Sequence, residues 1–244
     1  MALLEVNGIS KAFGGLQAVK DLSLSLEQGE ILGIIGPNGA GKTTAFNMVA
    51  GFFPPDSGTI RFKGENITWL RPWDISHRKI ARTFQLSKPF GDLTVLENAM
   101  VGGFHHQGSR AAARRKAEEV LEFVGMSHQA HIEAHNLTAT DRKRLELARC
   151  LATDPELLLL DEVVAGATPA EATAMMDLIR KIRDNGISIL MVEHVMRVVM
   201  GLSHRVLVLH HGVTIASGEP QVVSRDPAVL KAYLGERHVQ SGNP

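Results

Sequence analysis

The chain has 244 residues, and its 26 basic and 26 acidic side chains give a formal net charge of zero. Domains that mainly neutralise a phosphate backbone are usually markedly basic, so this balance argues against nucleic-acid binding and gives no reason to expect tight binding to an anionic membrane surface. The single cysteine, Cys150, cannot form an internal disulfide. The N-terminus does not have the pattern of a signal peptide, and no apolar stretch reaches the roughly 18 residues that span a bilayer. We therefore expect a cytoplasmic protein with a sizeable core.

Predicted strands and helices alternate through most of the chain, which is typical of an α/β fold with a largely parallel sheet. Strands are expected at residues 22–26, 31–35, 59–62, 157–160, 187–192, 205–210 and 213–217. Helices are expected from about Lys42, over 110–124, 141–152 and 169–183, and after His194. Between about Gln85 and Asp154 helix formers dominate, so we interpret this stretch as a mostly helical insertion.

A phosphate-binding loop is predicted between the strand at 31–35 and the helix that follows it. The residues that match the pattern G-x-x-x-x-G-K-[ST] are Gly36, Pro37, Asn38, Gly39, Ala40, Gly41, Lys42 and Thr43. Glycines let backbone N–H groups point at phosphate oxygens, and the helix offers its positive end. Lys42 would reach the β- and γ-phosphates, and Thr43 would bind Mg²⁺. The alternative is a glycine-rich turn without a ligand, which the strand-loop-helix context argues against.

The apolar strand 157–160 ends in two carboxylates, Asp161 and Glu162. In a phosphate-loop protein, such an aspartate holds magnesium, usually through water, and the glutamate can polarise an attacking water. Strands often end in acidic turns, so the pair alone is weak evidence. Together with the loop motif, it indicates a nucleotide-hydrolysing protein.

With these motifs and the helical insertion, the chain resembles the nucleotide-binding subunit of ABC transporters over nearly its whole length. The resemblance implies a P-loop ATPase core with a mostly parallel sheet and an antiparallel β subdomain at residues 1–84 and 156–244. An inserted helical subdomain, residues 85–155, would carry the family signature. ATP and Mg²⁺ are the ligands that the resemblance implies.

The resemblance also assigns roles to single residues. Phe13 would stack on adenine, with Val19 and Thr44 in the ATP-binding set, although a lone phenylalanine is more often part of a core. Gln85 would touch Mg²⁺ and the attacking water. His194 would contact the γ-phosphate, although a histidine at a strand end is more often simply hydrogen-bonded. The implied catalytic residues are Lys42, Gln85, Glu162 and His194, and the implied metal ligands are Thr43, Gln85 and Asp161.

The chain departs from the family at the signature, which normally reads Leu-Ser-Gly-Gly-Gln. The matching residues, called here the signature segment, are Leu137, Thr138, Ala139, Thr140 and Asp141. In the family, this segment reaches the γ-phosphate on the opposite subunit through a hydroxyl, glycine N–H groups and a helix N-terminus. Thr138 can supply the hydroxyl, whereas Thr140 adds a β-branched side chain and Asp141 a negative charge. A simpler interpretation is that Thr138 and Asp141 form a capping box, and both roles can hold together, because capping aims the helix N–H groups.

Two further features lie next to these motifs. In the loop after Glu162, Val163-Val164 replaces the usual Pro-Thr or Pro-Ala, and residues 165–168 replace a stretch that commonly ends in Asp or Asn. In the family this loop communicates between the two active sites, so the departure bears on coupling more than on hydrolysis. The basic run Arg142-Lys143-Arg144 is interpreted as a solvated helix face.

Within the family, the chain is most similar to branched-chain amino acid importer subunits, at residues 13–19, 82–85, 94–98, 198–203 and 232–236. Amide and urea importers use very similar subunits. The resemblance implies a homodimer or a heterodimer with a homologous ATPase subunit, peripheral on the inner face of the cell membrane. Transmembrane permease subunits and, indirectly, a solute-binding protein would be its partners, with no nucleic acid.

Three alternatives remain open. The first is a lipopolysaccharide-type export ATPase, which shares several of the same stretches, and the second is a weakly hydrolysing regulatory subunit, which the altered signature favours. The third is a soluble ATPase of the same superfamily in DNA repair or translation. Such proteins usually carry a long coiled-coil insertion or a second nucleotide domain, and neither fits in 244 residues.

Overall fold

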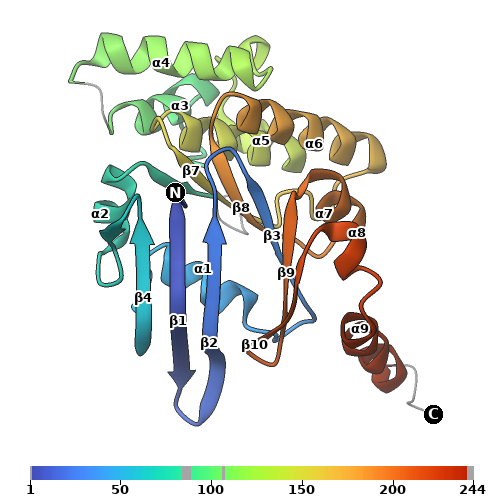
Figure 1. Ribbon diagram of the computed structural model, residues 1–244. Coiled ribbons are helices and arrows are strands. Elements are labelled where there is room, and N and C mark those ends of the chain that lie inside the picture. The colour runs from blue at the N-terminus through green and yellow to red at the C-terminus, as the bar shows by residue number, and fades with distance from the viewer. Residues whose placement is uncertain (1, 84–88, 106–107, 241–244) are drawn as a thin grey trace. The chain divides into compact units, whose positions relative to one another are not determined.

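The computed structural model describes residues 2–83, 89–105 and 108–240, and their side chains as far as residue 233. The chain divides into two compact units (Figure 1). The first unit comprises residues 1–75 and 188–244, and the second comprises residues 76–187. These limits differ from those of the predicted helical subdomain at 85–155, which stays a prediction.

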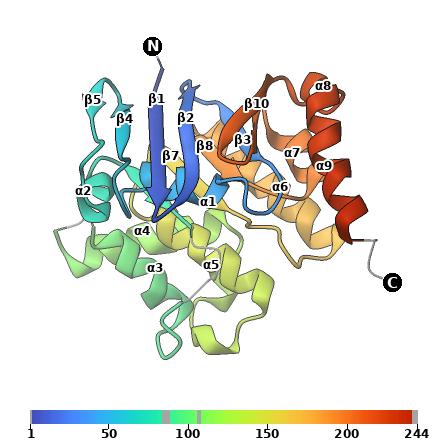
Figure 2. The same ribbon diagram turned by 90° about the horizontal axis from the view of Figure 1, so that it is seen from below.

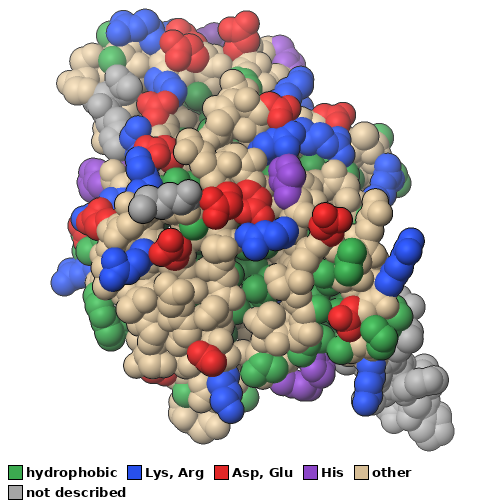
Figure 3. All heavy atoms as spheres, in the orientation of Figure 1, with side chains coloured by type: hydrophobic (Ala, Val, Ile, Leu, Met, Phe, Trp, Pro, Cys, Tyr) green, Lys and Arg blue, Asp and Glu red, His purple; other side chains and the backbone are tan. Residues whose placement is uncertain are grey.

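An antiparallel sheet forms one part of the first unit, with its strands in the order β2-β1-β4-β5 (Figure 2). Its strands are β1 (Leu4–Phe13), β2 (Leu16–Leu26), β4 (Ser57–Phe62) and β5 (Glu65–Asn66). The core side chains Leu4, Val6, Ile9, Leu22 and Leu26 are fully buried. Over β1 and β2, the face shown in Figure 3 is mostly uncharged. The antiparallel β subdomain that the resemblance implied is therefore present.

A second sheet in the first unit holds the strand that leads into the phosphate loop. Strand β3 (Ile31–Ile35) lies between β8 (Ser188–Val192) and β9 (Arg205–His210) and is parallel to both. Strand β10 (Val213–Gly218) pairs antiparallel with β9. Every residue of β3 and β8 is buried, as expected for parallel strands covered on both faces. Helices α1 (Lys42–Val49), α7 (Met196–Leu202), α8 (Pro220–Val223) and α9 (Pro227–Gln240) also belong to this unit. Helices α8 and α9 contact β10 (Figure 2).

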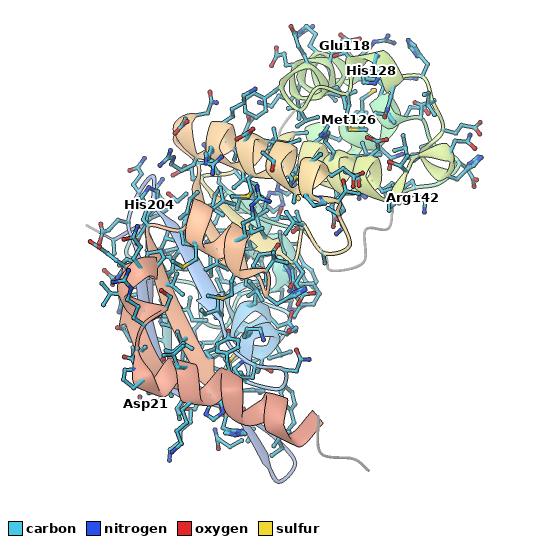
Figure 4. All side chains as sticks on the ribbon, turned by 90° about the vertical axis from the view of Figure 1, so that its right-hand side faces the viewer. Asp21, Glu118, Met126, His128, Arg142 and His204 are labelled. Atoms are coloured by element: carbon cyan, nitrogen blue, oxygen red, sulfur yellow. The ribbon has the colours of Figure 1, made fainter. Side chains whose placement is uncertain are left out.

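Two side chains at the start of β9 fix the start of β3. The Nδ1 atom of His204, labelled in Figure 4, accepts a hydrogen bond from the Ile31 N–H at 2.9 Å. The Arg205 guanidinium donates to the Glu30 carboxylate at 2.6 Å and to the Ser25 carbonyl at 2.5 Å. The bond to Glu30 raises the pKa of Arg205. The strand that carries the phosphate loop is thus tied to a strand that comes much later in the chain.

The second unit is mostly helical around a pair of parallel strands, β6 (Ile80–Arg82) and β7 (Leu157–Asp161). Its helices are α3 (Val95–Gly103), α4 (Arg110–Phe123), α5 (Ala139–Leu151) and α6 (Pro169–Asp184), with 3-10 turns at Ser127–Gln129 and Ala134–Asn136. Helix α2 (Pro72–His77) straddles the boundary between the units. Helix α3 packs on α4 and α5, where a Cβ at Gly102 would lie 2.2 Å from the Arg149 carbonyl oxygen. Glycine at this position therefore permits the close approach of α3 and α5.

The α/β fold with a largely parallel sheet is confirmed, and so are the predicted strands and helices, to within about two residues for most of their ends. Several elements were not predicted as such, among them strand β1 and helices α2, α3, α8 and α9. Among the residues that the structure describes, no helix combines the length and apolar character needed to cross a bilayer. Charged side chains of both signs are interspersed over α5 and α6 in Figure 3, in keeping with the zero net charge.

Candidate nucleotide-binding site

The phosphate loop joins β3 to α1, and three of its glycines have a backbone that other residues rarely adopt. The φ angles of Gly36, Gly39 and Gly41 are 150°, 75° and 100°. A Cβ at Gly36 would lie 2.1 Å from the Leu209 carbonyl oxygen, and a Cβ at Gly41 would lie 2.4 Å from the Ala18 carbonyl oxygen. The loop is therefore a glycine cradle for steric as well as conformational reasons.

Helix α1 begins without a side chain that caps it. Its N-cap is Gly41, which offers no side-chain hydrogen bond, and its first turn holds no acidic residue. In that turn, Thr43 is exposed and Thr44 is half-buried. The first N–H groups of a helix have no partner within the helix, and they carry the positive end of its dipole. The start of α1 is therefore suited to bind an anion such as phosphate.

The Lys42 ammonium lies inside the loop. The residue is only 8% exposed, and its Nζ donates to the carbonyl oxygens of Gly36 at 2.7 Å and Pro37 at 2.8 Å. The hairpin turn after β9 supports the same loop, because the Gly212 N–H donates to the Ala40 carbonyl at 3.0 Å. A positive charge is thus held where the glycine N–H groups gather.

Phe13, at the end of β1, presents an exposed ring. The side chain is 47% exposed and meets Phe53 edge to face, with 5.3 Å between the ring centroids. The Lys11 ammonium lies 5.8 Å from the Phe13 ring centroid and pairs with Asp56 at 2.7 Å. The Lys11 bond lowers the pKa of Asp56. The ring is therefore held from one side and free to stack on a flat ligand on the other.

Two other predicted residues of the first unit have different surroundings. Val19 is fully buried, and its Cγ2 lies 3.2 Å from the place where a Cβ at Gly41 would be, so it supports the phosphate loop from beneath. Its contact with ATP stays a prediction. His194 follows β8 and is exposed, next to the buried Glu193. Gln85 lies outside the described residues.

Asp161, in the second unit, ends β7 and is only 4% exposed. Its carboxylate accepts a hydrogen bond from Arg82 Nη2 at 3.1 Å, and its backbone N–H donates to Thr83 Oγ1 at 3.1 Å. Burial lowers the pKa of the Arg82 guanidinium, and the nearby Asp161 charge opposes that shift. This ion pair holds the carboxylate at the end of the strand. This ion pair was not predicted from the sequence, although Arg82 lies in the stretch 82–85 that supports the family resemblance.

Glu162 stands in a left-handed turn directly after β7. Its φ is 50°, a value that costs a residue with a side chain about 1–2 kcal/mol. The Ala165 N–H donates to the Glu162 carbonyl at 3.2 Å, and the buried Val163 and Val164 anchor the segment. Non-glycine residues in this region of φ cluster at functional sites, so the turn marks Glu162 as a functional candidate.

The signature segment forms the start of α5, where Thr138 is the N-cap, so the predicted capping box is confirmed for its Thr138 half. The Thr138 hydroxyl oxygen accepts from the Asp141 N–H at 3.1 Å, and the hydroxyl donates to the Asp141 carboxylate at 2.7 Å. The Thr140 hydroxyl donates to the Glu171 carboxylate of α6 at 2.8 Å. The two Thr hydroxyls are therefore engaged within the chain, and Leu137 is buried.

The interpretation of the run 142–144 as a solvated face is wrong for two of its residues. Arg142, labelled in Figure 4, donates through Nη2 to the His135 carbonyl at 2.7 Å. Lys143 Nζ donates to the Ala165 carbonyl at 2.5 Å, in the loop after Glu162. A basic run on a helix does not reveal from sequence which of its members will fold back onto a neighbouring loop.

The structure thus brings predicted residues together within each unit. In the first unit, the loop 36–43, Thr44 and Val19 are neighbours, and in the second unit the signature segment adjoins the loop that begins at Glu162. The glycine cradle of the first unit fits a polyphosphate. Hydroxyl and carboxylate oxygens are ligands that Mg²⁺ prefers, and Thr43 in the first unit and Asp161 in the second each carry one. Among the described residues, no group of three His, Cys, Asp or Glu could hold a metal by itself.

Comparisons with known proteins agree with this geometry. Residues 19–165 match the family described as "ABC transporter", and residues 213–239 match the "Branched-chain amino acid ATP-binding cassette transporter" family. The chain belongs to the ABC transporter family. It is an ATP-binding subunit, of a class of ATPases coupled to transport.

Similar proteins cover almost the whole chain. The "High-affinity branched-chain amino acid transport ATP-binding protein LivG" of Salmonella typhimurium is 41% identical, over 96% of this chain and 98% of its own. BraF of Pseudomonas aeruginosa, described in the same words, is 38% identical over the same shares. A crystal structure of an ATP-binding cassette of an ABC transporter in its ADP conformation has a TM-score of 0.88 and 32% identity, covering 96% of this chain and 99% of that one. A nucleotide-free cassette has a TM-score of 0.87 and 31% identity over the same shares.

Proposed function

We propose that the chain is the ATP-hydrolysing subunit that powers import of branched-chain amino acids or related small polar solutes. The observation that carries the proposal is the glycine cradle with Lys42 at the start of α1. It occurs in a chain that is 41% identical over almost its whole length to a branched-chain amino acid transport ATP-binding protein. The local geometry supports ATP binding, and the class of transported solute is inferred from the names of the relatives.

In the proposed reaction, backbone N–H groups of the loop after Pro37 bind the phosphates of ATP, and Lys42 neutralises the β- and γ-phosphates. The exposed ring of Phe13 stacks on adenine. Thr43, Gln85 and Asp161 would hold the magnesium, Asp161 through water. Bound magnesium would neutralise charge that develops on the phosphate oxygens.

Glu162 polarises a water molecule for in-line attack on the γ-phosphate. The P–O bond to the β-phosphate breaks, so ADP and inorganic phosphate are the products. Lys42 and His194 stabilise the negative charge that develops on the transferred phosphoryl group. The buried ion pair between Arg82 and Asp161 keeps the end of β7 in place while this happens.

The proposed assembly is a dimer, either of two copies or of this chain with a homologous ATPase subunit. The signature segment of each subunit would face the ATP bound to the other. The dimer would dock on transmembrane permease subunits at the inner face of the cell membrane, with a solute-binding protein delivering the solute. The start of α5, which is already capped by Thr138, is the part of this assembly that departs furthest from the family.

Replacement of the proposed water-polarising residue tests the hydrolytic step. In the purified full chain with Mg-ATP, Glu162→Gln should lower the hydrolysis rate by about 10²–10⁴-fold, the usual contribution of general base catalysis. ATP binding, measured by calorimetry, should persist. Glu118→Gln is a matched control, because Glu118 is an exposed residue of α4 that forms an ion pair with Arg114 of the same helix at 2.8 Å. Equal hydrolysis by the wild type and Glu162→Gln would contradict the proposal.

A second experiment tests the transport role. The tagged chain is purified from gently solubilised native membranes, and its partners are identified by mass spectrometry. Two permease subunits and a binding protein for leucine, isoleucine or valine are the expected partners. Export-type membrane subunits would favour the lipopolysaccharide alternative, and recovery without any membrane protein would contradict a transport role.

One structural observation keeps a regulatory subunit as a second candidate. Both hydroxyls of the signature segment are engaged within the chain, and Asp141 places a carboxylate in the first turn of α5. A wild-type chain that binds ATP but hydrolyses it at the rate of Glu162→Gln would support this second candidate against the first.

A further inference from the structure

Lys143 connects the signature helix to the turn that carries Glu162. The residue is half-buried on α5, two residues after the signature segment. Its Nζ donates to the Ala165 carbonyl at 2.5 Å and lies 3.5 Å from the Glu162 carbonyl. One ammonium group thus lies at the two carbonyls that open and close the same short turn.

That turn needs an external support. Glu162 has a φ of 50° and Gly166 a φ of 75°, so the backbone is left-handed at two places within five residues. The hydrogen bond from the Ala165 N–H to the Glu162 carbonyl, at 3.2 Å, is longer than the usual value of about 2.9 Å. A lysine ammonium has three donors and forms charge-assisted hydrogen bonds, which are stronger than neutral ones.

A second contact fixes the distance between α5 and the far end of the same segment. The Thr140 hydroxyl donates to Glu171 at 2.8 Å, and Glu171 also accepts from the backbone N–H of Thr168, which caps α6. The cavity left between Lys143, Thr140 and the loop is only about 20 Å³, which is room for about one water. Residues 162–168 are therefore held by α5 at both ends.

We propose that Lys143 is a positioning residue for Glu162, fixing through the Glu162 and Ala165 carbonyls the turn from which that side chain acts. The proposal rests on the proposed function, in which Glu162 polarises the attacking water. It also connects the helix that follows the altered signature segment to the altered loop of the same subunit. Misplacement of a catalytic group by about 1 Å can cost up to about a hundredfold in rate.

Lys143→Met isolates this contact, because methionine keeps the apolar stem and loses the ammonium. Helix α5 should survive the change, since its side chains Leu145, Leu147 and Ala148 are fully buried. Lys181→Met is the matched control. It removes one lysine charge from the same unit, at an exposed position in the last turn of α6.

Hydrogen–deuterium exchange of the full chain tests the contact without relying on hydrolysis. In Lys143→Met, the amides of residues 163–167 should exchange about tenfold faster, as expected when one charge-assisted hydrogen bond is lost. The amides of α5 and those of Lys181→Met should exchange at the wild-type rate. Unchanged exchange at 163–167, or an equal rise across α5, would overturn the proposal.

Steady-state kinetics test the positioning. Lys143→Met should lower kcat for Mg-ATP by about tenfold, at an unchanged KM and an unchanged dissociation constant for ATP. Lys143→Arg, which restores a charged donor, should recover most of kcat. If kcat stays at the wild-type value, or falls together with nucleotide affinity and the melting temperature, Lys143 is not a positioning residue.

Glu162→Gln, measured in parallel, separates the two proposals. If it hydrolyses ATP as the wild type does, the proposed function fails, and the positioning role fails with it. If it abolishes hydrolysis while Lys143→Met changes neither amide exchange nor kcat, the proposed function stands and only the positioning role is lost.

Discussion

The starts of α1 and α5 are built in opposite ways. Helix α1 begins at Gly41, with no capping side chain and no acidic residue in its first turn. Helix α5 begins with the Thr138 hydroxyl on the Asp141 N–H, and Asp141 puts a carboxylate in the first turn. Both carry the same dipole, but the start of α1 is left open, whereas α5 satisfies one of its N–H groups with Thr138 and adds a negative charge beside the others. The comparison teaches that a capping side chain and an acidic first turn weaken the attraction of a helix N-terminus for an anion without removing it.

The largest loss of stability is expected at Gly41, because the start of α1 has no room for a side chain there. Gly41→Ala should destabilise the fold by about 2–5 kcal/mol, from the left-handed backbone together with overpacking against the Ala18 carbonyl, and ATP binding should fall with it. Urea unfolding and calorimetry with Mg-ATP measure both effects. Gly29→Ala is the matched control, because Gly29 also has a positive φ, of 74°, but a Cβ there meets nothing within 4 Å. Equal losses in the two variants would show that packing against Ala18 is unimportant.

Removal of the Thr138 cap from the start of α5 should cost less stability than Gly41→Ala. Thr138→Ala deletes the acceptor for the Asp141 N–H and should lower the free energy of unfolding by about 1 kcal/mol. Thr173→Ala, which removes a hydroxyl from the exposed face of α6, should stay within about 0.5 kcal/mol of the wild type. An unchanged stability for Thr138→Ala would mean that the start of α5 is open like that of α1.

Replacement of the acidic residue should make the start of α5 more like that of α1. If the signature segment faces the partner's ATP, Asp141→Gln removes a repulsion of about 1 kcal/mol and should lower the ATP concentration for half-maximal hydrolysis roughly fivefold. Asp184→Asn, at the last residue of α6, serves as the control, because it also removes one carboxylate charge. A higher ATP requirement in Asp141→Gln would show that the cap matters more than the repulsion.

The smallest effect concerns pH. Backbone and hydroxyl hydrogen bonds from Thr168, and the one from Thr140, lower the pKa of Glu171 below 4.5. A depressed carboxyl pKa stabilises the fold above the unfolded-state pKa, and this stability is lost as the pH falls through the folded-state value. The wild type should therefore lose more melting temperature than Glu171→Gln on acidification from neutral pH to below 4.5. If the melting temperatures of the wild type and Glu171→Gln fall equally across that pH range, Glu171 does not contribute to acid sensitivity.

The phosphate loop was predictable from sequence because its structure is local. Strand β3 was predicted with the bounds that the structure gives, and Lys42 with the loop before it follows from a continuous pattern of glycines. The hydrophobic run and the glycine spacing each depend on neighbouring residues alone. Family resemblance then added the roles of Phe13 and His194, which no local pattern would have suggested.

The missed features depend on contacts between distant segments. The bonds of Lys143 to Ala165 and of Arg82 to Asp161 join residues 22 and 79 positions apart. Helix α3 carried a local signal, the capping box of Thr94 and Glu97, but its last residues include Gly102, which packing against α5 requires. A glycine chosen for tertiary contact lowers helix propensity, so the pattern did not indicate a helix.

The neighbours of β3 set the order in which the molecule can be completed. On both sides, β3 pairs with strands from residues 188–192 and 205–210, and the Gly212 N–H holds the Ala40 carbonyl of the loop. When the phosphate loop leaves the ribosome, β8, β9 and Gly212 have not yet been synthesised. Their pairing closes long stretches of chain, which is entropically costly and slow. The newly made chain therefore binds nucleotide only after residues 188–212 have been made and paired, and a chain truncated before residue 212 should not bind it.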